Sequence, residues 1–308
     1  MFKILLSAYA CEPNKGSEPE VGWKWATTLA KLNHEVYVVT RSNNKENIEN
    51  YLKTNEITNL NFIYFDYPDW VLKIIKGKSN PFSYFYFLLW QIGIFFAVKP
   101  FIDKIKFDFI HHVTFVSFRF PSLLCLYKIP FIFGPIAGGE TIPNNLRKKL
   151  PLATKFKELL RDVSNYYVKI SPLINLNFYK SYKIFVTSEE SKRLIPLRYH
   201  YKTKILLAIG MENIVQKNIE FNKNSDKFNI IYAGILEPRK GISILLETFR
   251  LIKKKNNNAI LNIVGSGSML PAMQKKAIET NINESINWFG QINKDEVLNL
   301  FNKNDLLL

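Results

Sequence analysis

The feature that most constrains this chain is a repeated alternation of short apolar runs with helical segments. The runs lack a polar residue at every second position, as is typical of parallel strands covered on both faces. In the first two thirds of the chain they span residues 3–7, 35–40, 61–65, 107–111, 130–133 and 183–186. Helical segments such as residues 20–32 and 44–53 separate them. This rhythm predicts an open, doubly wound α/β domain.

A second α/β pattern begins at Lys227. Its apolar runs span residues 228–233, 260–264, 286–289 and 305–308, and its helical segments span 242–254, 269–280 and 295–301. We therefore expect an N-terminal domain over residues 1–205, a linker over 206–226 and a C-terminal domain over 227–308. No covering helix follows the last run, so we expect the second domain to be incomplete and the chain to be C-terminally truncated.

Two segments of the first domain depart from the simple alternation. Residues 81–98 are the most apolar stretch, but it is short for a membrane span and Ser83, Gln91 and Gly93 interrupt it. We expect a buried or interfacial helix there. Residues 141–181 are basic and have weak helical spacing, which predicts a loop with helices that cover the domain.

The charge balance limits the kinds of partner. Lys and Arg outnumber Asp and Glu by 42 to 26, a formal net charge of +16 that favours an anionic partner. The cations are dispersed and no aromatic-basic motif accompanies them, so we expect no nucleic acid. The two cysteines, Cys11 and Cys125, exclude a disulfide scaffold and fit a reducing compartment. With no signal-peptide pattern at Met1, a cytoplasmic location is expected.

Glycine-containing loops follow two strands of the first domain, where ligands bind in open α/β sheets. In the first loop, Gly16 permits close approach of a ligand and the next helix offers free N–H groups to an anion. Ser17 either shares this role or caps the helix. The second loop, residues 134–140, contains Gly138 and Gly139 and ends with the carboxylate of Glu140. Glu140 is either a ligand contact or a charge near a helix start.

Two adjacent histidines, His111 and His112, are predicted at the end of the strand that begins at Phe107. Successive side chains of a strand point to opposite faces, so one of them could face a cleft as a polar contact or an acid/base. The alternative is a histidine bonded to the backbone. No Cys, His or carboxylate cluster accompanies them, so a metal site is not expected.

The second domain has two such loops of its own. Arg239 and Lys240 stand just before a predicted helix, where cations oppose the helix dipole unless a phosphate lies between them. The next loop contains Gly265 and Gly267, again directly after a strand.

Several segments in order along the chain resemble a single family. They read ACEPNKGSEPEVGWKWA, HHVTF and FRFPS, GPIAGGE, GILEPRKG followed by SILLETF, IVGSGSMLPAM, and WFGQINKDEVLNLF. Together they are similar to the retaining family 4 glycosyltransferases of the GT-B fold, also called glycosyl transferases group 1, over essentially the whole chain. The resemblance implies two Rossmann-like, doubly wound parallel-sheet domains that face a cleft.

The resemblance also implies site residues. The donor, a nucleoside diphosphate sugar, would be bound by Gly16, Ser17, Gly138, Gly139, Glu140, Arg239, Lys240, Gly265 and Gly267. The catalytic candidates are His111, His112 and Lys240, which matches the lysine of the family's RxxxxKG signature. Ile235 stands where that signature has arginine, and Arg239 is the candidate to compensate. The family's paired glutamates would lie beyond Leu308, so we expect these residues alone to bind nucleotide without turnover.

The expected function is transfer of a sugar to a saccharide or lipid-linked saccharide in bacterial surface polysaccharide synthesis. The protein would need neither cofactor nor metal, and would dock at the inner face of an anionic membrane. The alternatives are a nucleotide-sugar epimerase of the same fold and a non-catalytic fragment that binds a nucleotide sugar. Consumption of an acceptor distinguishes the transferase from the epimerase.

Overall fold

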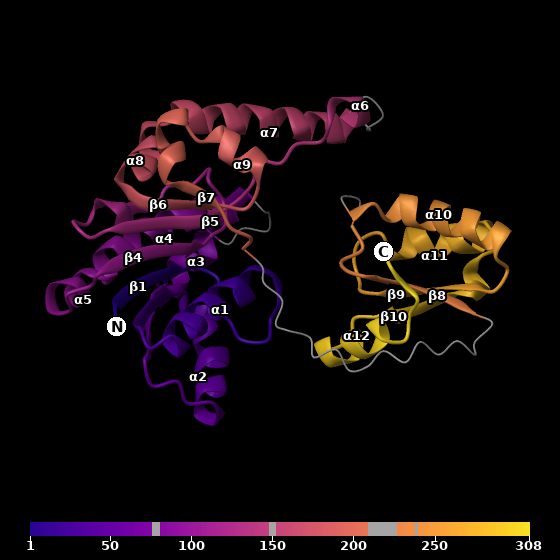
Figure 1. Ribbon diagram of the computed structural model, residues 1–308, viewed down its shortest axis with the longest axis horizontal. Helices are drawn as coiled ribbons and strands as arrows, with labels where there is room; N and C mark the ends of the chain where they lie inside the picture. Colours follow the sequence, from indigo (N-terminus) through magenta and orange to yellow (C-terminus); the bar gives the residue numbers. More distant parts are fainter. Residues whose placement is uncertain (76–80, 148–151, 209–226, 238–239) are drawn as a thin grey trace. The chain divides into compact units, whose positions relative to one another are not determined.

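A computed structural model describes residues 1–75, 81–147, 152–208, 227–237 and 240–308 (Figure 1). The chain divides into two compact units, Met1–Glu212 (unit 1) and Asn213–Leu308 (unit 2). Of the predicted linker, residues 206–208 belong to unit 1, and residues 209–226 lie outside the described residues.

Unit 1 is built on a parallel sheet with the strand order β3-β2-β1-β4-β5-β6-β7. Its strands are β1 (Lys3–Ala8), β2 (Glu35–Thr40), β3 (Leu60–Tyr64), β4 (Phe109–Thr114), β5 (Phe131–Ile136), β6 (Ser181–Val186) and β7 (Thr203–Ile205). Reversal of the strand order at β1 is the mark of a doubly wound sheet, so the predicted α/β class is confirmed.

The helices of unit 1 cover both faces of this sheet, as the unbroken apolar runs predict. They are α1 (Ser17–Lys31), α2 (Lys45–Thr54), α3 (Asp69–Ile75), α4 (Pro81–Ala97), α5 (Lys99–Lys104), α6 (Asn144–Arg147), α7 (Leu152–Ile170), α8 (Pro172–Lys180) and α9 (Glu189–Leu194). Neighbouring β1 residues Leu5 and Leu6 are both fully buried, in two different clusters. Since successive side chains point to opposite faces, each face of the sheet has its own core.

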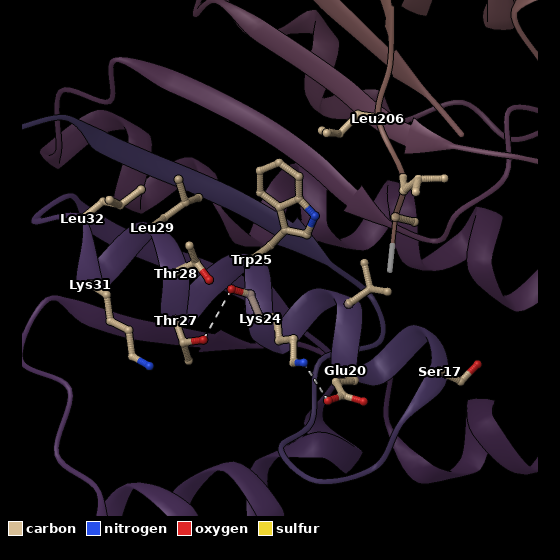
Figure 2. A pocket seen from close by; sticks show the side chains of 13 residues that line it. Ser17, Glu20, Lys24, Trp25, Thr27, Thr28, Leu29, Lys31, Leu32 and Leu206 are labelled. Carbon is tan, nitrogen blue, oxygen red and sulfur yellow. Dashed lines mark hydrogen bonds and ion pairs between the residues drawn. The ribbon is translucent and has the colours of Figure 1, made fainter. Parts of the chain in front are cut away.

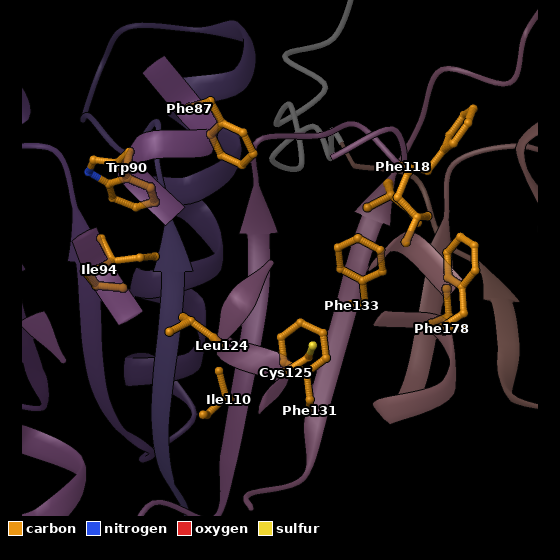
Figure 3. Close-up of a cluster of buried hydrophobic side chains, with 14 of the residues drawn as sticks. Phe87, Trp90, Ile94, Ile110, Phe118, Leu124, Cys125, Phe131, Phe133 and Phe178 are labelled. Atoms are coloured by element: carbon orange, nitrogen blue, oxygen red, sulfur yellow. The ribbon is translucent and has the colours of Figure 1, made fainter. Parts of the chain in front are cut away.

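Helix α4 contributes a large part of the core shown in Figure 3. Its Phe87, Trp90 and Ile94 are fully buried at helical spacing, in one cluster with Phe133 of β5 and Phe178 of α8. Within the described residues, Tyr84–Lys104 is long and apolar enough to cross a membrane by length and composition. Because Phe87, Trp90 and Ile94 are buried against the sheet, packing explains the apolar sequence of α4.

Unit 2 repeats the same architecture at a smaller size. Its parallel strands follow the order β10-β9-β8-β11, with β8 (Phe228–Ala233), β9 (Ala259–Val264), β10 (Ile286–Gly290) and β11 (Leu306–Leu307). Its helices are α10 (Ile242–Lys255), α11 (Leu270–Glu279) and α12 (Lys294–Phe301). Ile230, Phe249 and Leu261 are fully buried in its core.

The structure corrects several expected elements of unit 1. Strand β4 continues to Thr114, so both histidines lie inside it and not after it. Strand β7 was not expected, because three residues are too short for an apolar run to be recognised. The prediction of a loop with helices over residues 141–181 is confirmed by α6, α7 and α8, although the 19-residue α7 is unusual because its apolar side faces outward.

Candidate functional site

The loop after β1 is held in shape by a buried carboxylate. Glu12, only 5% exposed, accepts hydrogen bonds from Lys15 Nζ at 2.7 Å and from Asn47 Nδ2 at 2.5 Å. Gly16 has φ +66°, and a Cβ there would meet nothing within 4 Å. Its backbone is therefore left open. Ser17 begins α1 with φ +53° and does not occupy the N-cap position, which is Gly16.

Glu18 joins this loop to the loop after β4. One of its carboxylate oxygens accepts the backbone N–H of Val116 at 2.5 Å. Burial raises the pKa of Glu18, and the Val116 hydrogen bond acts in the opposite direction. No sequence signal indicates this contact, since a glutamate in the first turn of a helix is common.

Glu140 lies at the centre of a second network, at the carboxyl ends of β5 and β6. Its carboxylate accepts the Gly138 N–H at 3.0 Å, the Ser188 hydroxyl at 2.6 Å and the Ser191 hydroxyl at 3.1 Å. Burial acts to raise the pKa of Glu140, but these hydrogen bonds outweigh it and the pKa lies below its ordinary value. Glu140 is therefore ionised at neutral pH and suited to accept hydrogen bonds from hydroxyl groups, not to donate a proton.

Arg119 anchors the same loop from the β4 side. Its Nη2 donates to the Gly138 carbonyl oxygen and to Asn165 Oδ1 of α7, both at 2.6 Å. A Cβ on Gly138, at φ +113°, would lie 2.7 Å from Arg119 Nη1, and one on Gly139 would lie 2.5 Å from Ser191 Cα. Gly139 is thus required by packing against backbone, and Gly138 by its positive φ, whatever the loop binds. The FRFPS segment contains Arg119, but only the structure reveals its partners.

The two histidines of β4 are both buried, at 4% and 1% exposure, so the prediction that one of them faces an open cleft is wrong for unit 1 as described. Nε2 of His111 meets the Gly134 carbonyl at 2.7 Å, and Nε2 of His112 meets the Phe115 carbonyl at 3.3 Å. Since a carbonyl only accepts, Nε2 carries the proton in each ring. Burial lowers both pKa values to about 4, so both rings are neutral at pH 7.

In unit 2, glycines join the loops that follow neighbouring strands. A Cβ on Gly265 would lie 1.9 Å from the Gly234 carbonyl oxygen, and one on Gly267 would lie 2.4 Å from the Leu236 carbonyl oxygen. The Gly265 N–H donates to the Gly290 carbonyl at 2.7 Å, which adds the end of β10. The loops after β8, β9 and β10 therefore form one surface, for which both predicted glycines are needed sterically.

Lys240 stands at the border of this surface, just before α10. It is exposed, and its N–H donates to the Glu237 carbonyl at 3.0 Å. The next residue, Gly241, has φ +71°, and a Cβ on it would meet nothing within 4 Å. Ile235, at the place of the family arginine, is 44% exposed. Arg239 lies outside the described residues.

A separate pocket of about 500 Å³ lies along the outer side of α1, against residues 206–208 (Figure 2). Figure 2 shows Trp25 and Leu29 of α1 on one side of it and Leu206 on the other. An ion pair joins Lys24 to Glu20 at 3.2 Å along its wall. Ser17 is the predicted site residue that lines it, whereas Glu140 does not.

Part of the chain matches a known protein family. Residues 215–308 match the family model of the glycosyl transferases group 1. No curated protein matches the chain in sequence.

Among solved structures, a glycosyltransferase from Rickettsia africae ESF-5 is similar, with a TM-score of 0.58 and 15% identity over 99% of this chain and 72% of that one. A TarM variant from S. aureus, bound to fondaparinux, alpha-GlcNAc-glycerol and UDP, has a TM-score of 0.60 and 11% identity over 100% and 80% of the chains. A putative UDP-N-acetylglucosamine 2-epimerase from Listeria monocytogenes has a TM-score of 0.50 and 16% identity over 99% and 73%.

The chain has two parallel sheets, and the strand order of each reverses at the first strand of that sheet. This architecture agrees with the fold that the chain shares with these structures. The sequence match over residues 215–308 includes Lys240 and the joined glycine loops. The chain has the fold of these glycosyltransferases, and its residues 215–308 match the glycosyl transferases group 1.

Proposed function

We propose that the protein transfers a sugar, with retention at the anomeric carbon, from a nucleoside diphosphate sugar to a saccharide or lipid-linked saccharide in bacterial surface polysaccharide synthesis. The observation that carries the proposal is the surface of unit 2 where three strand-end loops meet beside the exposed Lys240. Open backbone at Gly241 and the start of α10 adjoin this cation. A diphosphate matches this combination of a cation with free backbone N–H groups.

Chemistry at this surface requires stabilisation of the leaving diphosphate. Lys240 and the first N–H groups of α10 would supply it as fixed positive charge, without proton transfer. Arg239 is proposed as a second cation, and Gly265 and Gly267 as residues that shape the surface. No cofactor or metal takes part in the proposed reaction.

We assign recognition of saccharide hydroxyls to the Glu140 loop of unit 1. An ionised, exposed carboxylate accepts hydrogen bonds from hydroxyls, and Gly16 offers open backbone on the loop after β1. His111 and His112 are proposed as positioning residues, because their neutral buried rings bind the backbone at the ends of β5 and β4. The lowered pKa values argue against proton transfer by either ring at neutral pH.

The proposed location is the cytoplasm, at the inner face of the membrane, where a lipid-linked acceptor would be found. The formal net charge of +16 supports attraction to an anionic lipid surface.

An epimerase is the second candidate, because the Listeria structure shares the fold. The decisive experiment incubates the protein with UDP-glucose or UDP-N-acetylglucosamine, with and without a panel of saccharide acceptors. A transferase releases UDP and forms a glycoside only when acceptor is present, and the anomeric coupling in the product's NMR spectrum reports retention. Conversion of the donor to an epimer without acceptor would contradict the proposal. Nucleotide binding in calorimetry without either product would instead support a binding protein.

A further inference from the structure

Helix α7 is oriented with its polar side toward the protein. Glu158 and Asn165, at 5% and 6% exposure, face inward. Glu158 pairs with Arg161 at 3.1 Å, and Asn165 accepts the Arg119 hydrogen bond. Arg147 of α6 binds the next acid on the helix, Asp162, through two hydrogen bonds of 2.5 and 3.0 Å. The inward side of α7 therefore combines these polar contacts with the fully buried Val168.

The opposite side of α7 is apolar and exposed. Its side chains are between 51% and 83% exposed: Leu152, Phe156, Leu159, Leu160, Val163, Tyr166, Tyr167 and Ile170. At 3.6 residues per turn, these positions fall within an arc of about 120°. Figure 1 draws α7 along the edge of unit 1, with α8 and α9 on its inner side. A contiguous apolar surface of this kind marks an interaction site and not an ordinary solvated face.

Unpaired cations border this arc. Lys155 lies next to one edge of it and Lys157 lies beyond the other. Lys169 lies on the same side of the arc as Lys155, farther from its edge. None of the three makes an ion pair with another described residue, whereas both acids of the helix, Glu158 and Asp162, are paired with arginines. The outer side of α7 is thus apolar at its centre and positive at its margins.

We propose that this apolar arc of α7, with Lys155, Lys157 and Lys169, docks the protein on an anionic lipid bilayer. An amphipathic helix lying in the membrane interface combines an apolar face at the acyl boundary with cations at the headgroups. Tyr166 and Tyr167 suit this depth, because their rings are apolar and their hydroxyls polar. A second copy of the chain fits less well, since two copies of the same positive margin would repel each other. The inference specifies the surface for the proposed membrane location and does not depend on glycosyl transfer.

Vesicle co-sedimentation tests the docking directly. The full chain is mixed with vesicles of phosphatidylcholine alone, or of equal parts phosphatidylcholine and phosphatidylglycerol. We expect binding to the anionic vesicles that weakens with added salt. The double variant Phe156→Gln with Ile170→Gln should bind at least about tenfold more weakly, because it removes two inserted apolar side chains. The control Ile244→Gln changes an isoleucine of α10 that is 71% exposed and should bind like the parent.

A second measurement reports which face enters the lipid. Cys11 and Cys125 are buried, so a cysteine introduced on the surface is labelled selectively with an environment-sensitive dye. Dye on Val163→Cys should shift to the blue with anionic vesicles, and dye on Ile244→Cys should not. Circular dichroism verifies folding, which these exposed substitutions should preserve.

Equal binding of the α7 variant and the parent, or no shift at Val163→Cys, would overturn the proposal. A lipid-independent dimer in light scattering that Phe156→Gln dissociates would also overturn it, by assigning the face to a second copy. Calorimetry with UDP on the same variants separates the two questions, because loss of docking with unchanged UDP binding leaves the proposed function intact.

Discussion

The hydroxyl of Ser188 donates a hydrogen bond of 2.6 Å to the carboxylate of Glu140, across 48 residues of sequence. The same hydroxyl oxygen accepts the Ser191 N–H at 3.1 Å as the N-cap of α9. One side chain thus begins a helix and orients the exposed carboxylate of unit 1. The two roles are coupled, because a change at Ser188 alters both the helix end and the acidity of Glu140.

Replacing Ser188 by alanine should lower the free energy of unfolding by about 1 kcal/mol at neutral pH, through loss of the cap. Glu140 adds a pH-dependent part. Its pKa in the folded protein is below the ordinary 4.5, so its contribution is present above that pH and is lost as the pH falls through the lowered value. The cost of Ser188→Ala should therefore shrink on acidification below about pH 4.5, as urea unfolding would measure.

The matched control for this prediction is Asn293→Ala. Asn293 caps α12 of unit 2 by accepting the Glu296 N–H at 2.9 Å, and the cap that it forms does not involve Glu140. Its loss should cost a similar amount at neutral pH without the same acid dependence. If both variants lost stability in parallel at every pH, the coupling between Ser188 and Glu140 would be refuted.

Alanine at Gly265 should destabilise unit 2 by at least about 2 kcal/mol. The residue has φ +132°, and its new Cβ would lie 1.9 Å from a backbone oxygen that cannot move aside. Alanine at Gly241, with φ +71° and open space around it, should cost only about 1–2 kcal/mol. Hydrogen exchange of the β8, β9 and β10 amides measures both. Similar protection in the two variants would show that the steric argument at Gly265 fails.

The two buried histidines should make stability depend on pH in the mildly acidic range. Their pKa values in the folded protein are about 4, against an ordinary 6.5, so the unfolded chain binds more protons between these limits. Stability should then fall as the pH is lowered from 6.5 to 4, by up to about 1.4 kcal/mol per pH unit for each ring.

His112→Phe tests this origin, because His112 packs against the rings of Phe87 and Phe133 and its Nδ1 has no hydrogen-bond partner in the part of the chain that the structure describes. In urea unfolding between pH 4 and 6.5, the free energy of unfolding of the variant should depend less steeply on pH than that of the parent. The difference in slope should equal the contribution of one titrating ring. An unchanged slope would mean that His112 is protonated in the folded protein above pH 4.

Lys240→Ala should weaken UDP binding by about 10- to 100-fold in calorimetry, since a charge-assisted phosphate contact contributes about 1.5–3 kcal/mol. Added salt should reduce the difference between variant and parent. Lys275→Ala is the matched control, because Lys275 is an exposed lysine of α11 that pairs only loosely with Glu279 at 3.9 Å. If both variants bound UDP like the parent, Lys240 would not contact the diphosphate.

Much of the fold follows from local pattern. The run over residues 35–40 coincides with β2, and the run over 228–233 coincides with β8, because short runs of mostly apolar, β-branched and aromatic residues favour a buried strand. The loops that carry Gly16, Glu140 and Lys240 were also recognised, since glycines and charges directly after a strand are visible in sequence. Boundaries follow less directly from the sequence, and β4 continues three residues past the predicted run over 107–111, with His111 and His112 paired within the sheet.

The partners of these residues depended on tertiary structure. Arg119 contacts Gly138 and Asn165, and Ser188 contacts Glu140, over separations of 19 to 48 residues that no periodicity encodes. The orientation of α7 shows the same limit. Its sequence determines an apolar side and a polar side, but a helix alone does not dictate which side packs inward. Only the fold shows this, since Arg119, on the loop after β4, binds Asn165 and Arg147 of α6 binds Asp162, so that polar residues of the helix pack inward and its apolar side faces outward.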